Sequence, residues 1–461
     1  MSSMRQFLSD NRRIPFVTAP FAMDLAIVLG LWPLWWILGV EQFLPPMFLA
    51  WETIRYLIQS RGRFALNAPT AIAAALALWC VVPVLWVAPS DIDIFIKEIA
   101  AALCQALMLF LFWNAIRTTK DWRQAARGLN VLAAWVALGG LIFAVGLWRG
   151  EITSVLGWLL PESTSESSFF GSIAVREFGR RADAGNIFPL RLSSFALYAS
   201  TLSMATLVLA PLASWLFSAA KGWRRWAQGL VLAGLLVCLI GAESRIAYVA
   251  FLVACGVWVV ARSWGSPRYR RGLIFAAIAL AVALFGIVAY VGVGDTFQAV
   301  RETLAQWRPG SLMVRSRVYA ETFRLLPQHP IAGWGAQVQT RGEATAFSAG
   351  SHSSFLGMMF KHGIVGLALY IGLWVSIWRD IVKGLKKHAG MPHLRLFGIA
   401  AVAAMAAFNI REAADTWWWD QLLTMVVWTM WGLITVAPTL PSNGVAESHE
   451  PSFIQAEQPD G

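Results

Sequence analysis

Apolar residues occur in long blocks along almost the whole chain, and short polar stretches separate these blocks. A block of about 18 residues or more is long enough for an α-helix to cross the hydrocarbon core of a bilayer. The pattern predicts an all-α polytopic integral membrane protein with about twelve transmembrane helices in one domain over residues 1–437. We place the predicted spans at residues 21–39, 41–55, 68–88, 95–116, 128–148, 192–216, 228–242, 245–261, 273–293, 353–378, 396–410 and 420–437.

The composition agrees with this class of protein. Of the 461 residues, 57% are hydrophobic and 14% are charged, whereas about a quarter of the residues in a soluble domain are charged. The four cysteines all lie inside apolar blocks, which gives neither a disulfide framework nor a metal-type spacing. Residues 438–461 lack Lys and Arg and are polar and acidic, so we predict a disordered tail.

The positions of Lys and Arg predict how the chain crosses the membrane. Of the 37 basic residues, 22 lie at the N-terminus and in the connections near 55–63, 117–127, 218–226, 262–272 and 379–395. Short basic connections face the cytoplasm, whereas long loops cross the membrane regardless of their charge. We therefore predict that both termini and the basic connections are cytoplasmic. Two long loops, at about 149–191 and 294–352, then face outward.

The net charge and the short motifs exclude several functions. A formal charge of +11 is compatible with nucleic acid or with anionic lipid, but the basic residues flank the spans, so we expect membrane lipids and no nucleic acid as partners. The chain contains no G-x-x-x-x-G-K-[ST] and no H-E-x-x-H pattern. Asp91 and Asp93 have the D-x-D spacing that can hold a divalent ion, but this spacing arises easily by chance. We expect neither a metal nor a cofactor.

The second long loop contains stretches with helical spacing, at 297–307 and 314–326. One face of the second stretch comprises Val318, Tyr319, Thr322, Phe323, Leu325 and Leu326. On the opposite face, Arg317 and Glu321 have the i,i+4 spacing of a solvated ion pair, and Arg324 lies beside them. Arg315 points into the apolar face, where a guanidinium needs an anionic partner. Either Arg315 binds an anion, which we favour, or the helix begins after it.

Two more residues stand at unusual places. His352 ends the second long loop where a span begins, and a neutral histidine there can accept a proton from a sugar hydroxyl. Arg245 lies between two apolar runs with almost no loop, and ionisable residues at membrane depth are functional candidates. The alternatives are a histidine with only local hydrogen bonds and an arginine that snorkels at a helix end. We predict that both residues are functional.

Four arginines crowd the first long loop, namely Arg176, Arg180, Arg181 and Arg191. Guanidinium groups bind phosphates through paired hydrogen bonds, so the cluster can hold a phosphate-bearing substrate. An ordinary solvated basic loop has the same composition. The sequence does not separate these two readings.

Several of these residues together resemble the O-antigen ligase and polymerase superfamily. Its shared segment reads roughly R-x-x-x-W/Y, then P-x-x-G-x-G, then H-[NSQ]-x₉-G-x-x-G. Arg315 with Tyr319 matches the first part, Pro330 to Gly335 the second, and His352-Ser353 with Gly363 to Gly366 the third. Ser244-Arg245 before an apolar helix matches the start of the segment, so the resemblance covers about residues 230–380.

The resemblance implies a GT-C-like glycosyltransferase of the bacterial inner membrane that works at the periplasmic face without metal or nucleotide sugar. Its donor is a glycan on undecaprenyl diphosphate. Carried over by position, Arg245 and Arg315 hold the diphosphate, and His352 activates or orients the acceptor hydroxyl. Further substrate-binding candidates are Arg317, Tyr319, Arg180, Arg181 and Arg191, and the structural motif positions are Gly333, Gly335, Gly363 and Gly366. The family's Gly–Phe–Asn run before the sixth span is only approximated by residues 185–191.

Three alternatives stay open. A ligase moves a finished glycan onto lipid A-core, whereas a polymerase extends a growing polysaccharide; we favour the ligase because Ser follows His352. A lipid-linked oligosaccharide flippase or another transporter predicts charges along a path through the spans, whereas Asp24, Glu52 and Lys361 lie near span ends. A purely structural membrane scaffold gives no reason for Arg315 or His352.

Overall fold

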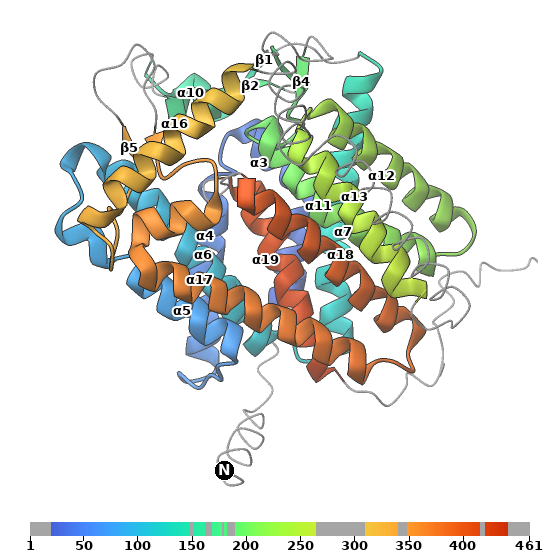
Figure 1. Cartoon of the computed structure of the whole chain (residues 1–461). Helices are drawn as coiled ribbons and strands as arrows, with labels where there is room; N and C mark the ends of the chain where they lie inside the picture. Colours follow the sequence, from blue (N-terminus) through green and yellow to red (C-terminus); the bar gives the residue numbers. More distant parts are fainter. Residues whose placement is uncertain are drawn as a thin grey trace, which may run out of the picture.

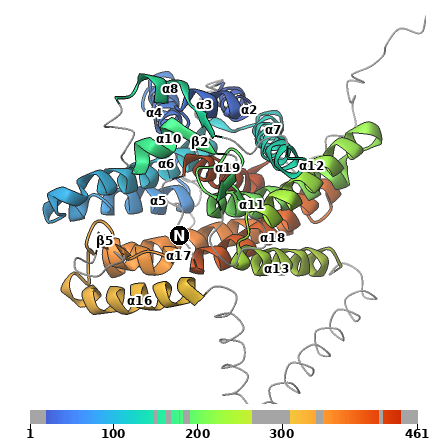
Figure 2. The ribbon, with the colours of Figure 1, turned by 90° about the horizontal axis from the view of Figure 1, so that it is seen from above.

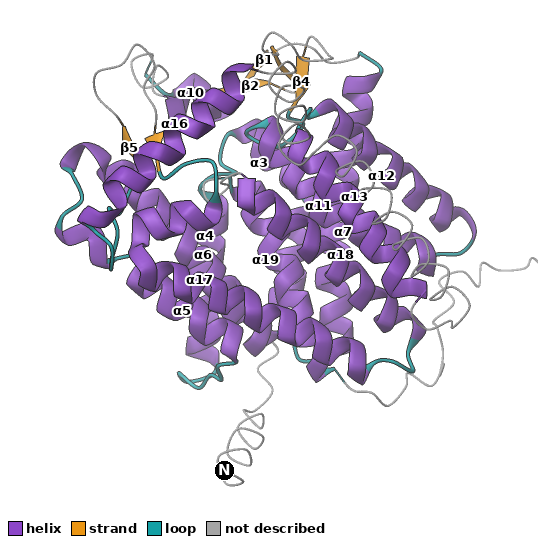
Figure 3. Ribbon diagram, in the orientation of Figure 1, coloured by secondary structure: helices purple, strands orange, loops and turns teal. Residues whose placement is uncertain are grey.

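The computed structural model describes residues 20–146, 151–161, 168–177, 179–181, 190–263, 309–339, 348–414 and 420–440. The described chain is almost entirely helical (Figures 1 and 3). Its main helices are α2 (Phe21–Gly30), α3 (Trp32–Leu38), α4 (Leu44–Gln59), α5 (Ala68–Trp79), α6 (Ile92–Ala115), α7 (Thr119–Ala144), α11 (Ala199–Ala219), α12 (Gly222–Gly241), α13 (Arg245–Ser263), α16 (Pro309–Leu325), α17 (Ser354–Lys387), α18 (Pro392–Ala414) and α19 (Gln421–Val436). The shorter helices are α8 (Val155–Leu159), α10 (Ser168–Ala174), η1 (Val82–Leu85), η2 (Pro89–Asp91), η3 (Leu326–Gln328) and η4 (Ala437–Thr439).

The long helices confirm an all-α polytopic membrane protein. Within the described residues, nine helices are long and apolar enough to cross a membrane, and α2 with α3, bent by 58°, makes a tenth. The predicted span 41–55 corresponds to α4, which has 16 residues and is not among the nine. The predicted span 273–293, the helix predicted at 297–307 and the tail from residue 441 lie outside the described residues. The count of about twelve therefore stays a prediction.

Local sequence determines where several of these helices begin. The side chain of Asn67 caps α5, and Thr118 with Asp121 forms a capping box at the start of α7. Ser353 caps α17 and Asp420 caps α19 in the same way. These side chains accept hydrogen bonds from first-turn N–H groups that have no partner within the helix.

Helix α19 lies at the centre of the bundle and is buried along its whole length (Figure 1). Helices α6, α7, α11 and α17 pack against it. In the next layer, α2 and α12 pack on α7, α5 packs on α6 and α17, and α13 packs along α18 (Figure 2). One continuous apolar cluster joins most of these helices, so the bundle forms a single core.

The segments of the two long loops gather at one end of the bundle, which we call the loop end (Figure 1). Besides α8, α10 and α16 they contain three antiparallel pairs of short strands: β1 (Glu151–Thr153) with β2 (Val175–Glu177), β3 (Gly179–Arg181) with β4 (Leu190–Leu192), and β5 (Val338–Gln339) with β6 (Ser348–Ala349). The helical spacing at residues 314–326 predicts α16, but the sequence does not predict these strands. Strands of two or three residues are too short to show a detectable alternation.

The basic connections gather at the opposite end, which we call the basic end. The rings of Trp122, Trp215 and Phe397 contact one another there, with centroids 4.8–5.8 Å apart. Trp122 Nε1 also donates a hydrogen bond to Leu433 O at 3.0 Å. These contacts join the start of α7, the end of α11, the start of α18 and the end of α19. The two ends thus alternate along the chain as the loop lengths and basic residues predict.

Strand β2 places Arg176 inside the protein, beneath the first long loop. Its Nη2 donates a 2.6 Å hydrogen bond to Glu41 Oε2, and both side chains are only 2% exposed. The guanidinium also lies over the Trp36 ring, 5.8 Å from its centroid. Arg176 is therefore neither a phosphate ligand nor a solvated charge, and both interpretations are wrong. It forms a buried ion pair that joins the first long loop to Glu41, between α3 and α4.

The charges near the span ends are also paired. Lys361 Nζ donates to Glu98 Oε1 at 2.7 Å, and both side chains are 1% exposed. At the basic end, Arg55 binds Asp24 at 2.7 Å and also binds Glu52. The sequence analysis overlooked Glu98, which lies inside the predicted span 95–116. Each of these charges has an opposite charge beside it, which offsets the cost of removing both from water.

Candidate functional site

A break in α17 shapes the loop end. Gly363 has φ +67° and ψ −170°, a conformation that is essentially restricted to glycine. It divides α17 into two arms, residues 354–362 and 364–387. The arms fold back on each other, so that the rings of Phe355 and Tyr370 contact at 5.6 Å. A helix that reads as one span in the sequence is therefore a short arm at the loop end followed by a long crossing arm (Figure 1).

The segment Pro330–Gly335, which we call the docking segment, is held on this break. An interrupted helix leaves carbonyl groups without N–H partners from its next turn. Trp334 N donates to Phe360 O at 2.9 Å, and Gly335 N donates to Lys361 O at 2.8 Å. In return, the N–H that follows Gly363 donates to Pro330 O at 2.9 Å. The P-x-x-G-x-G and G-x-x-G patterns therefore form one structural unit.

The four motif glycines stand where a side chain would collide with its surroundings. A Cβ on Gly363 would lie 2.0 Å from Ile331 O, and one on Gly333 would lie 2.3 Å from the Lys361 backbone. A Cβ on Gly335 would lie 2.8 Å from a proline side chain, and one on Gly366 would lie 2.4 Å from the His362 side chain. Gly333 and Gly363 thus allow the docking segment and the break in α17 to approach each other closely.

His352 lies at the free end of the short arm, immediately before the Ser353 cap. It has a φ of +62°, which is uncommon for a residue with a side chain. Its carbonyl accepts a 2.8 Å hydrogen bond from Tyr319 Oη of α16. Two residues earlier, Gly350 N donates to Thr322 Oγ1 at 2.8 Å. Helix α16 therefore holds the backbone around His352, whose side chain is half-buried.

The hydroxyl of Tyr319 has a structural partner. Its Oη donates to the backbone carbonyl of His352, and the role of Tyr319 in substrate binding stays a prediction. The structure gives it the role of joining α16 to the histidine. The R-x-x-x-Y spacing then has a simple meaning, because residues four apart lie on one face of a helix. Arg315 lies one turn before Tyr319 on the face that meets His352, and it is half-buried there.

The rest of α16 follows the predicted faces with one exception. Val318, Thr322 and Leu325 are buried, but Phe323 is 58% exposed, so its assignment to the inner face is wrong. The sequence predicts Arg317 as the partner of Glu321. Both carboxylate oxygens of Glu321 accept hydrogen bonds from Arg324, at 2.6 and 2.8 Å. These hydrogen bonds lower the pKa of Glu321 below its ordinary value. Arg317 is exposed, which leaves Arg315 as the inward-facing arginine of this helix.

Arg245 is the first residue of α13 and is half-buried at the loop end. The turn before it is held by Arg191, whose Nε and Nη2 donate to Ala242 O at 3.2 and 3.0 Å. Arg191 of the first loop and Arg245 are thus brought to the same turn. The starts of α13 and α16 lie on the same side of the molecule at the loop end (Figures 1 and 2). Arg245 is the first residue of α13, and Arg315 lies in the second turn of α16.

Arg180 and Arg181, the other two arginines that the sequence places in substrate binding, lie in strand β3. Arg180 is the backbone partner of Arg191 in the β3–β4 pair, and Arg181 is paired with Leu190. The side chains of Arg180 and Arg181 lie outside the described part of the structure. Their assignment to substrate binding stays a prediction. Asp93 of the D-x-D sequence lies 3.6 Å from Lys97, one helical turn away.

Sequence reasoning missed a buried charged pair of residues near this site, Arg411 and Glu412. They lie at the end of α18 that reaches the loop end, and they are 2% and 0% exposed. Tyr370 Oη donates a short hydrogen bond to Glu412 Oε1. An Arg-Glu pair that ends an apolar run is an available signal, because charges at membrane depth are costly.

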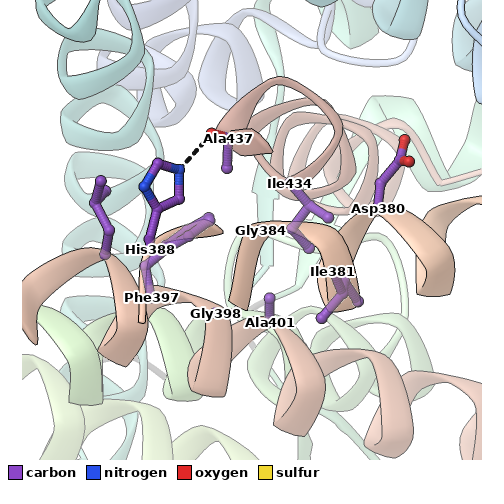
Figure 4. A pocket seen from close by; sticks show the side chains of 10 residues that line it. Asp380, Ile381, Gly384, His388, Phe397, Gly398, Ala401, Ile434 and Ala437 are labelled. Atoms are coloured by element: carbon purple, nitrogen blue, oxygen red, sulfur yellow. Dashed lines mark hydrogen bonds between the residues drawn. The ribbon is translucent and has the colours of Figure 1, made fainter. Parts of the chain in front are cut away.

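A small hollow opens at the basic end, far from His352 (Figure 4). His388 and Asp380 border it, and His388 Nε2 lies 2.8 Å from Ala437 O. The other lining residues are Ile381, Gly384, Leu394, Phe397, Gly398, Ala401, Ile434 and Ala437. The hollow lies at the opposite end of α17 from His352, so it is not part of the candidate site.

The fold and the loop-end site define a multi-pass membrane protein whose unusual polar residues lie at one end of a helical bundle. A family model described as O-antigen ligase matches residues 229–371. The O-antigen ligase of Pseudomonas aeruginosa strain PAO1 is 25% identical over 197 residues, which are 42% of this chain and 45% of the relative. The match thus spans less than half of that relative. Both comparisons confirm the resemblance to the O-antigen ligase and polymerase superfamily. The residues matched by the family model include Arg245, Arg315 and His352.

Proposed function

We propose that this protein transfers a glycan from undecaprenyl diphosphate to a hydroxyl group of lipid A-core, at the periplasmic face of the bacterial inner membrane. The observation that carries the proposal is the arrangement around His352. Its backbone is fixed by α16, and Arg315 lies on the same face of that helix one turn from the fixing tyrosine. The family match supports a glycosyl-transferring enzyme of the O-antigen ligase and polymerase type.

The chemistry needs two functions, and the site offers side chains for both. Negative charge develops on the departing diphosphate, and fixed guanidinium groups in a site with little water stabilise it. We assign this role to Arg245 and Arg315. The attacking hydroxyl must lose a proton, and an imidazole near neutral pH can accept it. We assign this role to His352.

The remaining features of the proposal follow from charge. The basic end faces the cytoplasm under the positive-inside rule, which puts the loop end in the periplasm. The acceptor hydroxyl forms the new glycosidic bond as the glycosyl–phosphate bond of the donor breaks, and undecaprenyl diphosphate leaves intact. This activated bond supplies the driving force, so no ATP is required. Because two arginines neutralise the diphosphate, we propose that transfer needs no divalent metal. Arg191 supports the turn before Arg245, and we assign it to the binding of the same donor.

The proposal is tested in a bacterial strain that lacks its own ligase, complemented with this chain or its variants. His352→Ala, Arg245→Ala and Arg315→Ala are expected to lower glycan attachment to lipid A-core by at least about a hundredfold. Matched controls remove the same side chain elsewhere: Arg262→Ala on α13, Arg324→Ala on α16, and His393→Ala at the basic end. These three residues are exposed and are expected to be dispensable.

The form of the surface glycan separates ligase from polymerase on a gel. Complementation by a ligase restores long glycan on lipid A-core, and the variants leave that polymer on its lipid carrier. A polymerase restores no glycan on lipid A-core in this strain. In a second strain, which lacks its own polymerase but keeps its ligase, a polymerase restores long glycan and its inactive variants leave single repeat units on lipid A-core. Normal attachment in all three variants, at normal protein levels, would refute the assignment of these residues.

A milder effect is expected at Thr322. Valine has the shape of threonine but no hydroxyl, so Thr322→Val leaves Gly350 N without its acceptor and loosens the His352 backbone. The loss of one such hydrogen bond corresponds to about a tenfold decrease in transfer rate. Thr322→Ser keeps the hydroxyl and is expected to keep at least half of the rate. The rates are compared in membranes that contain equal amounts of each variant.

A further inference from the structure

A chain of three interacting, buried side chains runs from the loop end of α18 to the short arm of α17. Glu412, at the end of α18, accepts a hydrogen bond from Tyr370 Oη on the long arm. Tyr370 also interacts with the side chain of Ser354, the first residue of the short arm. All three side chains have 0% exposure. The chain therefore links α18 to both arms of α17.

The chain reaches the short arm two residues after His352. Tyr370 can lie beneath Ser354 only because the break at Gly363 folds the two arms together, as the 5.6 Å contact of Phe355 with Tyr370 also shows. In an unbroken helix, residues 354 and 370 would be about 24 Å apart. The same break that docks Pro330–Gly335 thus brings a buried carboxylate into connection with the histidine segment.

His352 needs such support because of its backbone. A residue with a side chain at φ +62° is strained, and it keeps this conformation only when several contacts define it. Tyr319 holds its carbonyl from α16, and Ser353 caps the helix that follows. The chain through Ser354 fixes the same segment from the core side. Burying a carboxylate at membrane depth costs free energy, and such residues are functional candidates. The position of Glu412 in this chain of interactions therefore indicates a functional role.

We infer that Glu412 and Tyr370 are positioning residues that hold His352 in its working geometry through Ser354. The inference rests on the proposed function, because it assigns the carboxylate to the histidine that acts on the acceptor. Glu412 acts through Tyr370 and the first turn of α17, and it touches neither the donor nor the acceptor. Loosening the chain displaces the imidazole from the acceptor hydroxyl but leaves donor binding by the arginines intact.

The test measures kcat and KM for the lipid-linked donor with purified full-length protein. Tyr370→Phe removes one hydroxyl without leaving a large cavity. It is expected to lower kcat by about tenfold to a hundredfold while KM changes less than about threefold. Glu412→Ala is expected to do the same, whereas Glu412→Gln keeps an acceptor for Tyr370 and retains most of kcat. The control is Tyr56→Phe, which removes a buried tyrosine hydroxyl at the basic end and leaves kcat unchanged.

A double substitution separates positioning from general stability. If Tyr370 acts through His352, then adding Tyr370→Phe to His352→Ala produces no further loss of kcat. A further loss of similar size, or a kcat of Tyr370→Phe within twofold of the parent in folded protein, overturns the inference. Should Glu412→Ala fail to fold, Tyr370→Phe and Ser354→Ala decide alone. Full activity of His352→Ala instead refutes the proposed function, which keeps the two failures distinct.

Discussion

Replacing Gly363 by alanine is expected to abolish transfer and to lower the amount of folded protein in the membrane. The backbone conformation of Gly363 is one that only glycine adopts readily, and strain of this kind costs about 1–3 kcal/mol. The added Cβ would also lie 2.0 Å from Ile331 O, so the docking segment must move away. That movement breaks the hydrogen bonds to Phe360 O and Lys361 O. It also releases the short arm of α17, which begins just after His352.

Gly372 provides the matched control in the long arm of the same helix. A Cβ there meets a single side-chain atom at 4.0 Å, so the space is available. Alanine is favoured over glycine inside a helix by up to about 1 kcal/mol, so Gly372→Ala is expected to fold at least as well as the parent. Thermal unfolding in detergent and transfer in membranes measure both variants. Equal behaviour of Gly363→Ala and Gly372→Ala would contradict the described break.

Replacing Arg176 by methionine is expected to give the largest loss of stability. The substitution leaves the buried Glu41 carboxylate without its cationic partner at 2.6 Å. Breaking a buried ion pair from one side costs about 3–5 kcal/mol, a large fraction of the stability of most proteins. The first long loop is then expected to detach from α3, and proteases will cleave it faster. Unfolding temperature and limited proteolysis in detergent micelles check this result.

A double substitution identifies the cause of that loss. Glu41→Gln with Arg176→Met removes both charges, and buried pairs replaced on both sides are often neutral in stability. The double variant is therefore expected to recover most of what Arg176→Met loses. A double variant as unstable as the single one would show that Arg176 stabilises the loop by packing on Trp36 alone.

The helices and the two ends of the bundle could be predicted from the sequence, because they depend on local hydrophobicity and on the placement of basic residues. The inner face of α16 follows from helical periodicity at Val318 and Thr322. Phe323 departs from it because α16 lies at the surface and is covered on one side only (Figure 2). Helical periodicity predicts the direction of a side chain. It does not predict whether a neighbouring element reaches far enough to cover that side chain.

The break in α17 could not be predicted, although its glycines were singled out. The predicted span 353–378 reads as one apolar helix, and the break in it is held by a segment that lies about thirty residues earlier in the chain. The burial of Arg176 depends in the same way on Glu41, 135 residues away. Glu412 has no motif around it. Its connection to the site through Tyr370 exists only in the folded bundle.

The most direct test of the account uses purified protein in liposomes with an undecaprenyl-diphosphate-linked glycan, lipid A-core and EDTA. The parent chain and His393→Ala are expected to move the glycan onto lipid A-core at similar rates. His352→Ala is expected to be at least about a hundredfold slower. Transfer by His352→Ala at the parent rate, or a parent that regains activity only when a divalent metal is added, would contradict the proposed chemistry at the loop end.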